Sequence, residues 1–147
     1  MTMSAKTLFS SFTIASLLFC WGCGGSDGPP RSSVRGKITL DGVEIAEGTI
    51  TFFPTGGTKG PTAGTTISAG QYAIAADRGP VAGHYRIEIH GPRKTGRQVP
   101  APGPVVNAKA LVDEIVETVP KRYNLQSTLE ADVKPGRNEL DFALTAK

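Results

Sequence analysis

Both cysteines of this 147-residue chain lie in one short stretch, Cys20-Trp21-Gly22-Cys23. A C-x-x-C pair can form a redox-active disulfide, or one of its thiols can be the attachment point for lipid. A redox pair needs a thiolate of lowered pKa at the start of a helix, usually in a βαβ unit. The residues that follow, GGSDGPPRSS, have no helical pattern. The pattern therefore favours a role other than redox chemistry.

The residues before the cysteines have the pattern of a secretory signal. A short N-terminal region carries Lys6, and an apolar or small run follows from Thr7 to Phe19. This run is shorter than the roughly 20 apolar residues that a membrane span needs. The stretch resembles a bacterial lipobox, in which a small residue precedes the acylated cysteine. Gly22 before Cys23 fits that motif, whereas Cys20 and Trp21 depart from the Leu and small residue usual at their positions.

We therefore expect a lipoprotein signal peptide at residues 1–22, a lipid on Cys23, and no transmembrane helix in the processed chain. Acyl chains on Cys23 would then anchor the protein to a bacterial membrane, facing the periplasm or the exterior. Ordinary signal cleavage nearby is the alternative. Removal of residues 1–22 takes away Lys6, so the net charge falls from +3 to +2. So small a net charge gives no sign of the clustered basic face that nucleic-acid binding requires.

Other residue types that could carry chemistry do not converge in the sequence. The two histidines, His84 and His90, are separated by six residues of a predicted strand, or roughly 20 Å, which is too far for one metal ion. Asp113, Glu114 and Glu117 read as a solvated acidic cluster. The Gly-rich segment PTGGTKGPTAGTT lacks the Gly-Lys-Ser/Thr of a phosphate-binding loop. We expect no catalytic residues, no metal site, no cofactor and no enzyme activity.

The rest of the chain reads as a tether followed by an all-β domain. Residues 23–32 are rich in Gly, Ser and Pro, which favours a flexible linker. From residue 33 to 147 apolar residues alternate with polar ones, and Gly or Pro separates about seven such segments. This pattern predicts a single antiparallel β-sandwich. Asp41-Gly42 predicts a tight hairpin turn. Alternation predicts buried side chains at Ile38, Phe52, Ile74, Ile87 and Phe142.

Residues 91–120 differ from this pattern. The segment begins with GPRKTGRQVPAPGP, in which no strand pattern is evident. Apolar residues at helical spacing predict a short helix or turn near residues 108–114, followed by an extended approach to Pro120. Long irregular connections are uncommon in compact domains and tend to be functional or disordered. Arg93, Lys94 and Arg97 are therefore candidate contacts for an acidic partner or an anionic envelope surface, and a solvated variable loop is the alternative.

Three stretches carry a family resemblance: VRGKITLDGVEIAEGTITFFP, GPVAGHYRIEI and VPKRYNLQSTLEADVKPGRNELDFAL. Together they resemble small secreted lipoproteins of planctomycete bacteria that contain a carboxypeptidase regulatory-like, or transthyretin-like, β-sandwich. The resemblance implies a surface or periplasmic accessory protein and supplies no catalytic residues. Some transthyretin-like proteins hydrolyse a purine-derived ring, but they end in Tyr-Arg-Gly-Ser, whereas this chain ends in LDFALTAK.

These observations lead to an expected function. We expect a non-catalytic, lipid-anchored cell-envelope protein with a structural or protein-interaction role, whose partner is an envelope protein or polysaccharide. A weak carbohydrate or cell-wall binding module is the alternative. Sugar-binding sandwiches usually stack sugars on exposed aromatic rings, and alternation leaves Phe53 and Tyr123 as the aromatic side chains that could be exposed. For Tyr123, a packed position with its hydroxyl bonded at a corner is the other interpretation.

Overall fold

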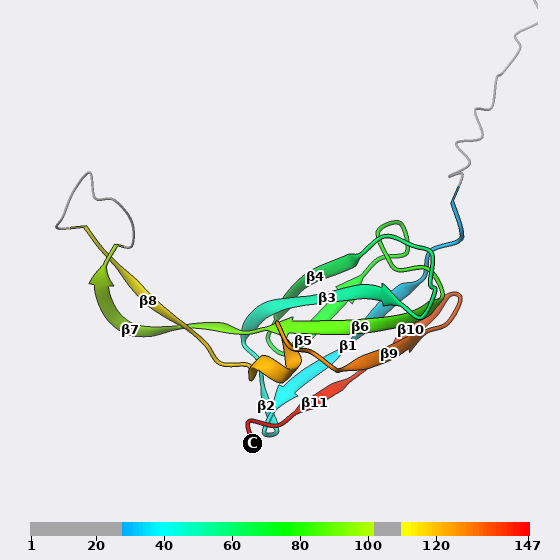
Figure 1. Cartoon of the computed structure of the whole chain (residues 1–147). Helices are drawn as coiled ribbons and strands as arrows, with labels where there is room; N and C mark the ends of the chain where they lie inside the picture. Colours follow the sequence, from blue (N-terminus) through cyan, green and yellow to red (C-terminus); the bar gives the residue numbers. More distant parts are fainter. Residues whose placement is uncertain (1–27, 102–109) are drawn as a thin grey trace, which may run out of the picture.

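The computed structural model describes residues 28–101 and 110–147, which form an all-β fold (Figure 1). The predicted signal peptide, with Cys20 and Cys23, lies outside the described residues. A 3-10 helix, η1 (Lys121–Tyr123), joins the arm described below to the last strands. The strands are β1 (Ser33–Leu40), β2 (Val43–Glu44), β3 (Glu47–Thr55), β4 (Ala63–Ser68), β5 (Gln71–Ile74), β6 (Gly83–His90), β7 (Pro92–Pro100), β8 (Leu111–Glu117), β9 (Glu130–Val133), β10 (Arg137–Glu139) and β11 (Phe142–Leu144).

Nine of these strands form a curled sheet that makes the body of the molecule. The order along the sheet is β10-β1-β5-β4-β3-β6-β9, and β2 and β11 also pair with β1. Within the described chain, β4 and β5 pair at one position, Ser68–Gln71, so this single pair joins the part of the sheet around β1 to the part around β3. The prediction of an all-β, largely antiparallel fold is confirmed. The structure differs from the prediction in two respects. The sheet has nine strands where about seven were predicted, and β10 and β11 run parallel to β1.

The core lies inside the curled sheet and follows the predicted alternation. All five residues predicted to be buried are buried: Ile38, Phe52, Ile74, Ile87 and Phe142. On β6, Tyr85, Ile87 and Ile89 point inward, and the polar residues between them are more exposed. Burial of these large side chains from water supplies the main stabilising free energy of the body.

Aromatic side chains join the two halves of this core. The ring of Phe52 lies 6.1 Å from that of Tyr85 and 6.3 Å from that of Tyr72, and the Tyr72 ring stacks on Phe142 at 6.3 Å. These separations are within the range in which aromatic pairs attract one another.

A turn and a glycine fix the register of β1. Asp41 and Gly42 both have positive φ, 51° and 80°, as a two-residue hairpin turn between β1 and β2 requires. The predicted turn is therefore confirmed. Farther back on β1, Gly36 leaves room for the carbonyl oxygen of Leu140, which would lie 1.9 Å from a β-carbon at that position.

The segment at 91–120 corrects two predictions. Its described residues form β7 and β8, which pair as an antiparallel two-stranded ribbon, rather than an irregular loop. Residues 111–114 belong to β8, so the predicted helix is wrong there, and residues 102–109 lie outside the described residues. The extended approach to Pro120 is confirmed. The β-branched residues Val112, Ile115 and Val116 favour a strand over a helix.

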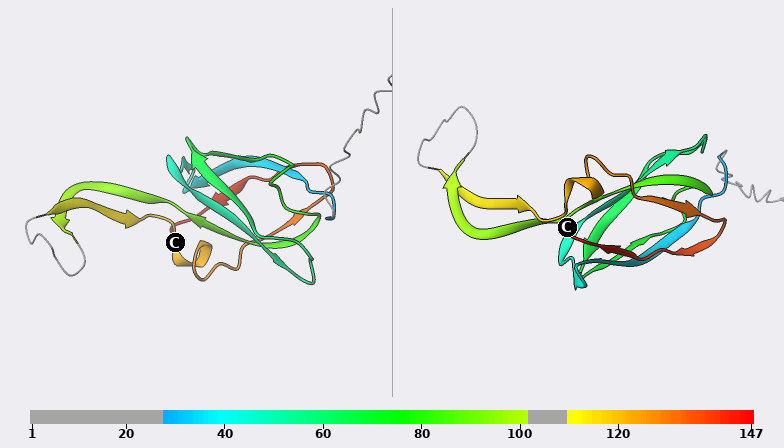
Figure 2. Two further views of the ribbon diagram at one scale, coloured as in Figure 1. Left: turned by 90° about the horizontal axis from the view of Figure 1, so that it is seen from above. Right: turned by 60° about the horizontal axis from the view of Figure 1, so that its bottom comes forward.

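The ribbon of β7 and β8, hereafter the arm, projects from one end of the body in every view (Figures 1 and 2). The first described residues lie at the opposite end. There Arg31 forms a bridge with Val81, and the Ser32 amide donates to the Pro80 carbonyl oxygen at 2.7 Å. Ordered pairing thus begins two residues before β1. The described chain therefore enters the body at the end farthest from the arm.

Candidate functional site

The two histidines occupy opposite ends of β6, and each faces a different carboxylate. His84 pairs with Asp132 of β9, and the Nδ1 of His90 lies 3.1 Å from Oε2 of Glu117. Residues 28–101 and 110–147 hold no group of three His, Cys, Asp or Glu side chains that could bind a metal ion. These residues form two separate histidine–carboxylate contacts at opposite ends of β6.

The two aromatic residues considered for sugar stacking are both covered by arginine. The guanidinium of Arg86 lies 4.8 Å from the ring centre of Phe53, and that of Arg122 lies 4.9 Å from the ring centre of Tyr123. The Tyr123 hydroxyl lies 3.3 Å from Thr145 Oγ1, in keeping with the corner interpretation. Hydrogen bonding with Thr145, followed by Arg122, lowers the pKa of Tyr123 to about 8. One face of each ring therefore already has a cation as its partner.

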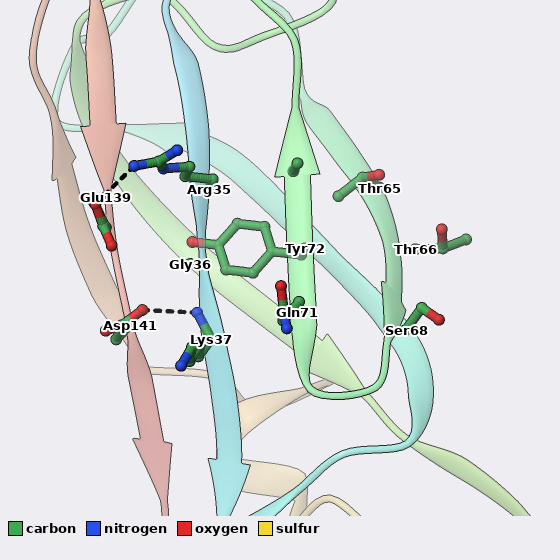
Figure 3. Close-up of a pocket in the computed structure, with 11 residues that line it drawn as sticks. Arg35, Gly36, Lys37, Thr65, Thr66, Ser68, Gln71, Tyr72, Glu139 and Asp141 are labelled. Atoms are coloured by element: carbon green, nitrogen blue, oxygen red, sulfur yellow. Dashed lines mark hydrogen bonds and ion pairs between the residues drawn. The ribbon is translucent and has the colours of Figure 1, made fainter.

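The hollow drawn in Figure 3 is lined mainly by polar and charged residues, and several of them are bonded to one another. It has a volume of about 550 Å³ and lies over β1, β4 and β5. Arg35 pairs with Glu139 at 3.2 Å, and the Lys37 amide donates to Asp141 Oδ1 at 2.7 Å. Tyr72 donates its hydroxyl to the Leu140 carbonyl oxygen at 2.7 Å. Burial, with a smaller contribution from Asp141, raises the pKa of Tyr72 far above its usual value.

The arm concentrates exposed aliphatic side chains. Leu111, Val112, Ile115 and Val116 of β8 are 56%, 40%, 61% and 37% exposed. They are four of the six large hydrophobic residues that are exposed in the described part of the chain. Side chains alternate between the two faces of a strand, so apolar groups lie on both faces of the arm. Neither face is buried against the body.

The arm is electrically neutral over its described strands. β7 carries Arg93, Lys94 and Arg97, and β8 carries Asp113, Glu114 and Glu117. The charges pair across the ribbon, since Lys94 Nζ lies 2.8 Å from Asp113 Oδ2 and Arg97 lies 3.8 Å from Glu114 Oε2. The bond to Asp113 raises the pKa of Lys94.

The basic residues that the sequence singles out therefore lie together on one strand of the arm. The residues expected to be a solvated acidic cluster lie opposite them. Two of the three cations are already paired with carboxylates of β8.

The base of the arm is fixed by a single carboxylate, that of Glu117. Its Oε1 accepts hydrogen bonds from the Gly91 amide at 2.8 Å and the Val119 amide at 2.9 Å, and its Oε2 contacts His90. Partial burial opposes ionisation, but these hydrogen bonds outweigh it and lower the pKa of Glu117. Thr118 Oγ1 also donates to the Gly91 carbonyl oxygen at 2.6 Å. We call these contacts the base clamp.

A groove of about 890 Å³ lies where the arm meets the body. Its walls come from the β1–β2 turn, the β4–β5 turn and the first residues of the arm. The apolar side chains that line it include Leu40, Val43, Ile45, Pro92 and Ile115. Glu44, Glu47, Arg93 and Lys94 stand around it. The arm and this groove, hereafter the base groove, form the candidate functional site.

Sequence reasoning missed the base clamp and the base groove. The partners of Glu117 come from both ends of the segment 91–120. His90 and Gly91 lie at its start and Val119 at its end, so the sequence does not show that they meet. The one local signal was Gly91-Pro92, because Gly91 separates β6 from β7 and Pro92 is the first residue of β7. Cys23, the predicted lipid site, lies outside the described residues.

Comparison with known proteins adds no relative: no family model, curated protein sequence or solved structure matches the chain. Within the described residues, the structure has no helix of the length and apolar character needed to cross a membrane.

Proposed function

We propose that this is a non-catalytic, lipid-anchored protein of the bacterial cell envelope whose arm makes protein contacts. The observation that carries the proposal is the arm itself, a projecting ribbon with aliphatic side chains exposed on both faces. An isolated two-stranded ribbon is marginally stable in water, and exposed apolar patches mark interaction sites. In a structural or protein-interaction role, another protein would cover these aliphatic side chains.

The proposal includes a fold type and an anchor. The two parts of the curled sheet, joined at Ser68–Gln71, are proposed to form a transthyretin-like sandwich. The anchor is proposed to be a lipid on Cys23, on the basis of the apolar run and Gly22 that precede it. Because the described chain starts at the end opposite the arm, a lipid at Cys23 would leave the arm directed away from its own attachment point.

The weak carbohydrate-binding alternative has less support. Its two candidate stacking rings, Phe53 and Tyr123, are each covered by an arginine of the same chain. At the hollow of Figure 3, Arg35 is likewise paired with Glu139, and Asp141 already accepts a hydrogen bond from the Lys37 amide. The apolar side chains of the arm suit a protein surface better than a sugar.

The anchor is tested by Cys23→Ser in the full chain. One acyl chain gives marginal membrane binding and several hold firmly, so the variant is expected in the soluble fraction and the wild type in the membrane fraction. Mass spectrometry of the purified wild type should find a lipid-modified Cys23. An unmodified Cys23, or wild-type protein in the soluble fraction, would contradict the anchor.

The arm is tested in cells by chemical cross-linking of the full chain followed by gel analysis of its complexes. Ile115→Thr and Leu111→Thr keep residues suited to a strand but remove apolar surface, so cross-linked complexes should decrease. Leu125→Thr is the matched control, because Leu125 is 77% exposed and lies outside the arm. Equal complexes in wild type and both arm variants would refute an arm-mediated contact.

A further inference from the structure

One face of the arm presents exposed apolar side chains and also borders the base groove. Ile115 lines the groove, and strand alternation places Leu111 on the same face of β8. The register agrees, because Ile115 pairs with Lys94 and Leu111 pairs with Pro100 of β7. Four residues of strand separate the two side chains, or about 14 Å. We call this the inner face of the arm.

We propose that a second copy of this chain occupies the base groove, with the inner faces of two arms packed against each other in opposite directions. This inference rests on the proposed function and names the partner of the arm. In a two-fold arrangement centred near Asp113, Leu111 of each copy lies over Ile115 of the other. The Leu111 side chain of each copy then enters the base groove of the other copy. Such a contact is self-complementary, as the interface of a two-fold dimer must be.

The side chains that would meet in this contact are apolar and exposed in the single chain. Leu111 is 56% exposed, and Val43 and Ile115 in the groove are 70% and 61% exposed. The same surface thus supplies the group to be buried and the place that buries it. A second copy presents an apolar side chain and an apolar groove at the same spacing, so it covers both regions at once.

The charges of the inner face also favour a second copy. Each Asp113 is already bonded to Lys94 of its own chain at 2.8 Å, so the centre of the contact brings no uncompensated charge together. The described strands of the arm carry equal numbers of cations and carboxylates. A strongly charged partner would gain little from such a surface, whereas an equally neutral copy meets no net repulsion.

The contact is tested by a disulfide between copies. Two full-length versions with different tags, one carrying Leu111→Cys and the other Val43→Cys, are produced in the same cells and oxidised in isolated membranes. The proposal expects a mixed-tag disulfide dimer, because Leu111 of one copy enters the groove that Val43 of the other lines. Leu125→Cys combined with Val43→Cys is the matched control for random collision, and adding Ile115→Thr to both copies should lower the yield about tenfold.

The outcomes separate this inference from the proposed function. A mixed dimer with Leu111→Cys well above the Leu125→Cys control supports the second copy. Equal yields with both overturn it. An arm-dependent complex with a different protein, without the mixed dimer, also overturns it but leaves the proposed function standing. If cross-linking in cells shows no arm-dependent complex of any kind, the proposed function itself fails.

Discussion

The base clamp gives the sharpest test of how the arm is held. Glu117→Ala removes the acceptor of two backbone hydrogen bonds, from Gly91 at 2.8 Å and from Val119 at 2.9 Å. Hydrogen bonds to a charged group contribute about 1.5–3 kcal/mol each. The Glu117 side chain is 37% exposed, so water replaces part of that, and the combined loss should be about 2 kcal/mol.

Hydrogen exchange measured by NMR reports this loss at the two amides themselves. A change of about 2 kcal/mol in the free energy of local opening corresponds to about 30-fold faster exchange at Gly91 and Val119. Glu117→Gln retains an acceptor oxygen but no charge, and neutral hydrogen bonds are about half as strong. It should therefore give an intermediate acceleration at the same two amides.

The pH dependence of exchange tests the charge separately. The pKa of Glu117 is lowered in the folded protein, so its stabilisation is fully present above the unfolded pKa of about 4.3. It is lost as pH falls through the lower folded value. After correction for intrinsic exchange, the wild type should lose protection at Gly91 and Val119 in that range, and Glu117→Gln should not.

Glu114→Gln is the matched control on the same strand. Glu114 accepts a hydrogen bond from Thr95 Oγ1 at 2.6 Å and pairs with Arg97, and both contacts lie along the arm, away from its base. This variant should leave exchange at Gly91 and Val119 unchanged. The reasoning is refuted if Glu117→Ala exchanges like the wild type at both amides, or if Glu114→Gln accelerates them equally.

Two further predictions concern the body. Tyr72→Phe removes the donor to the Leu140 carbonyl oxygen at 2.7 Å, so thermal or denaturant unfolding should show a loss of about 1–2 kcal/mol, and an unchanged midpoint would show that water replaces the bond. Ile87→Ala creates a cavity in the fully buried centre of β6 and should lower the free energy of unfolding by about 2–5 kcal/mol; a Glu130→Ala control on the exposed side of β9 should change it little.

The buried side of the body was predictable because one physical requirement governs it. A strand with one face in a core and the other in water must alternate, and Ile38, Phe52, Ile87 and their neighbours do so. The Asp41-Gly42 turn was also legible, since few residues adopt positive φ there. The parallel pairing of β1 with β10 and β11 was not, because it joins residues about a hundred positions apart.

The arm was missed for the opposite reason. Neither of its faces is buried by the body, so its strands are under no requirement to alternate. In β8 the apolar residues come in adjacent pairs, Leu111-Val112 and Ile115-Val116, which also fits helical spacing. Three cations, a glycine and two prolines in β7 further hide its strand character. The three cations were singled out as candidate partner contacts, but the pairing of two of them with β8 depends on a strand register that the sequence does not express.

The base clamp also makes the arm a lever. Its fulcrum is tight, because a β-carbon at Gly91 would lie 3.0 Å from a methyl carbon of Val119 and 3.2 Å from one of Ile45. The nine residues of β7 extend about 30 Å beyond that point. A rotation of about 10° at Gly91 would therefore move the far end by about 5 Å, roughly the spacing between neighbouring strands. The residues at 90–91 and 117–119 thus set the direction of the exposed side chains farther along the arm.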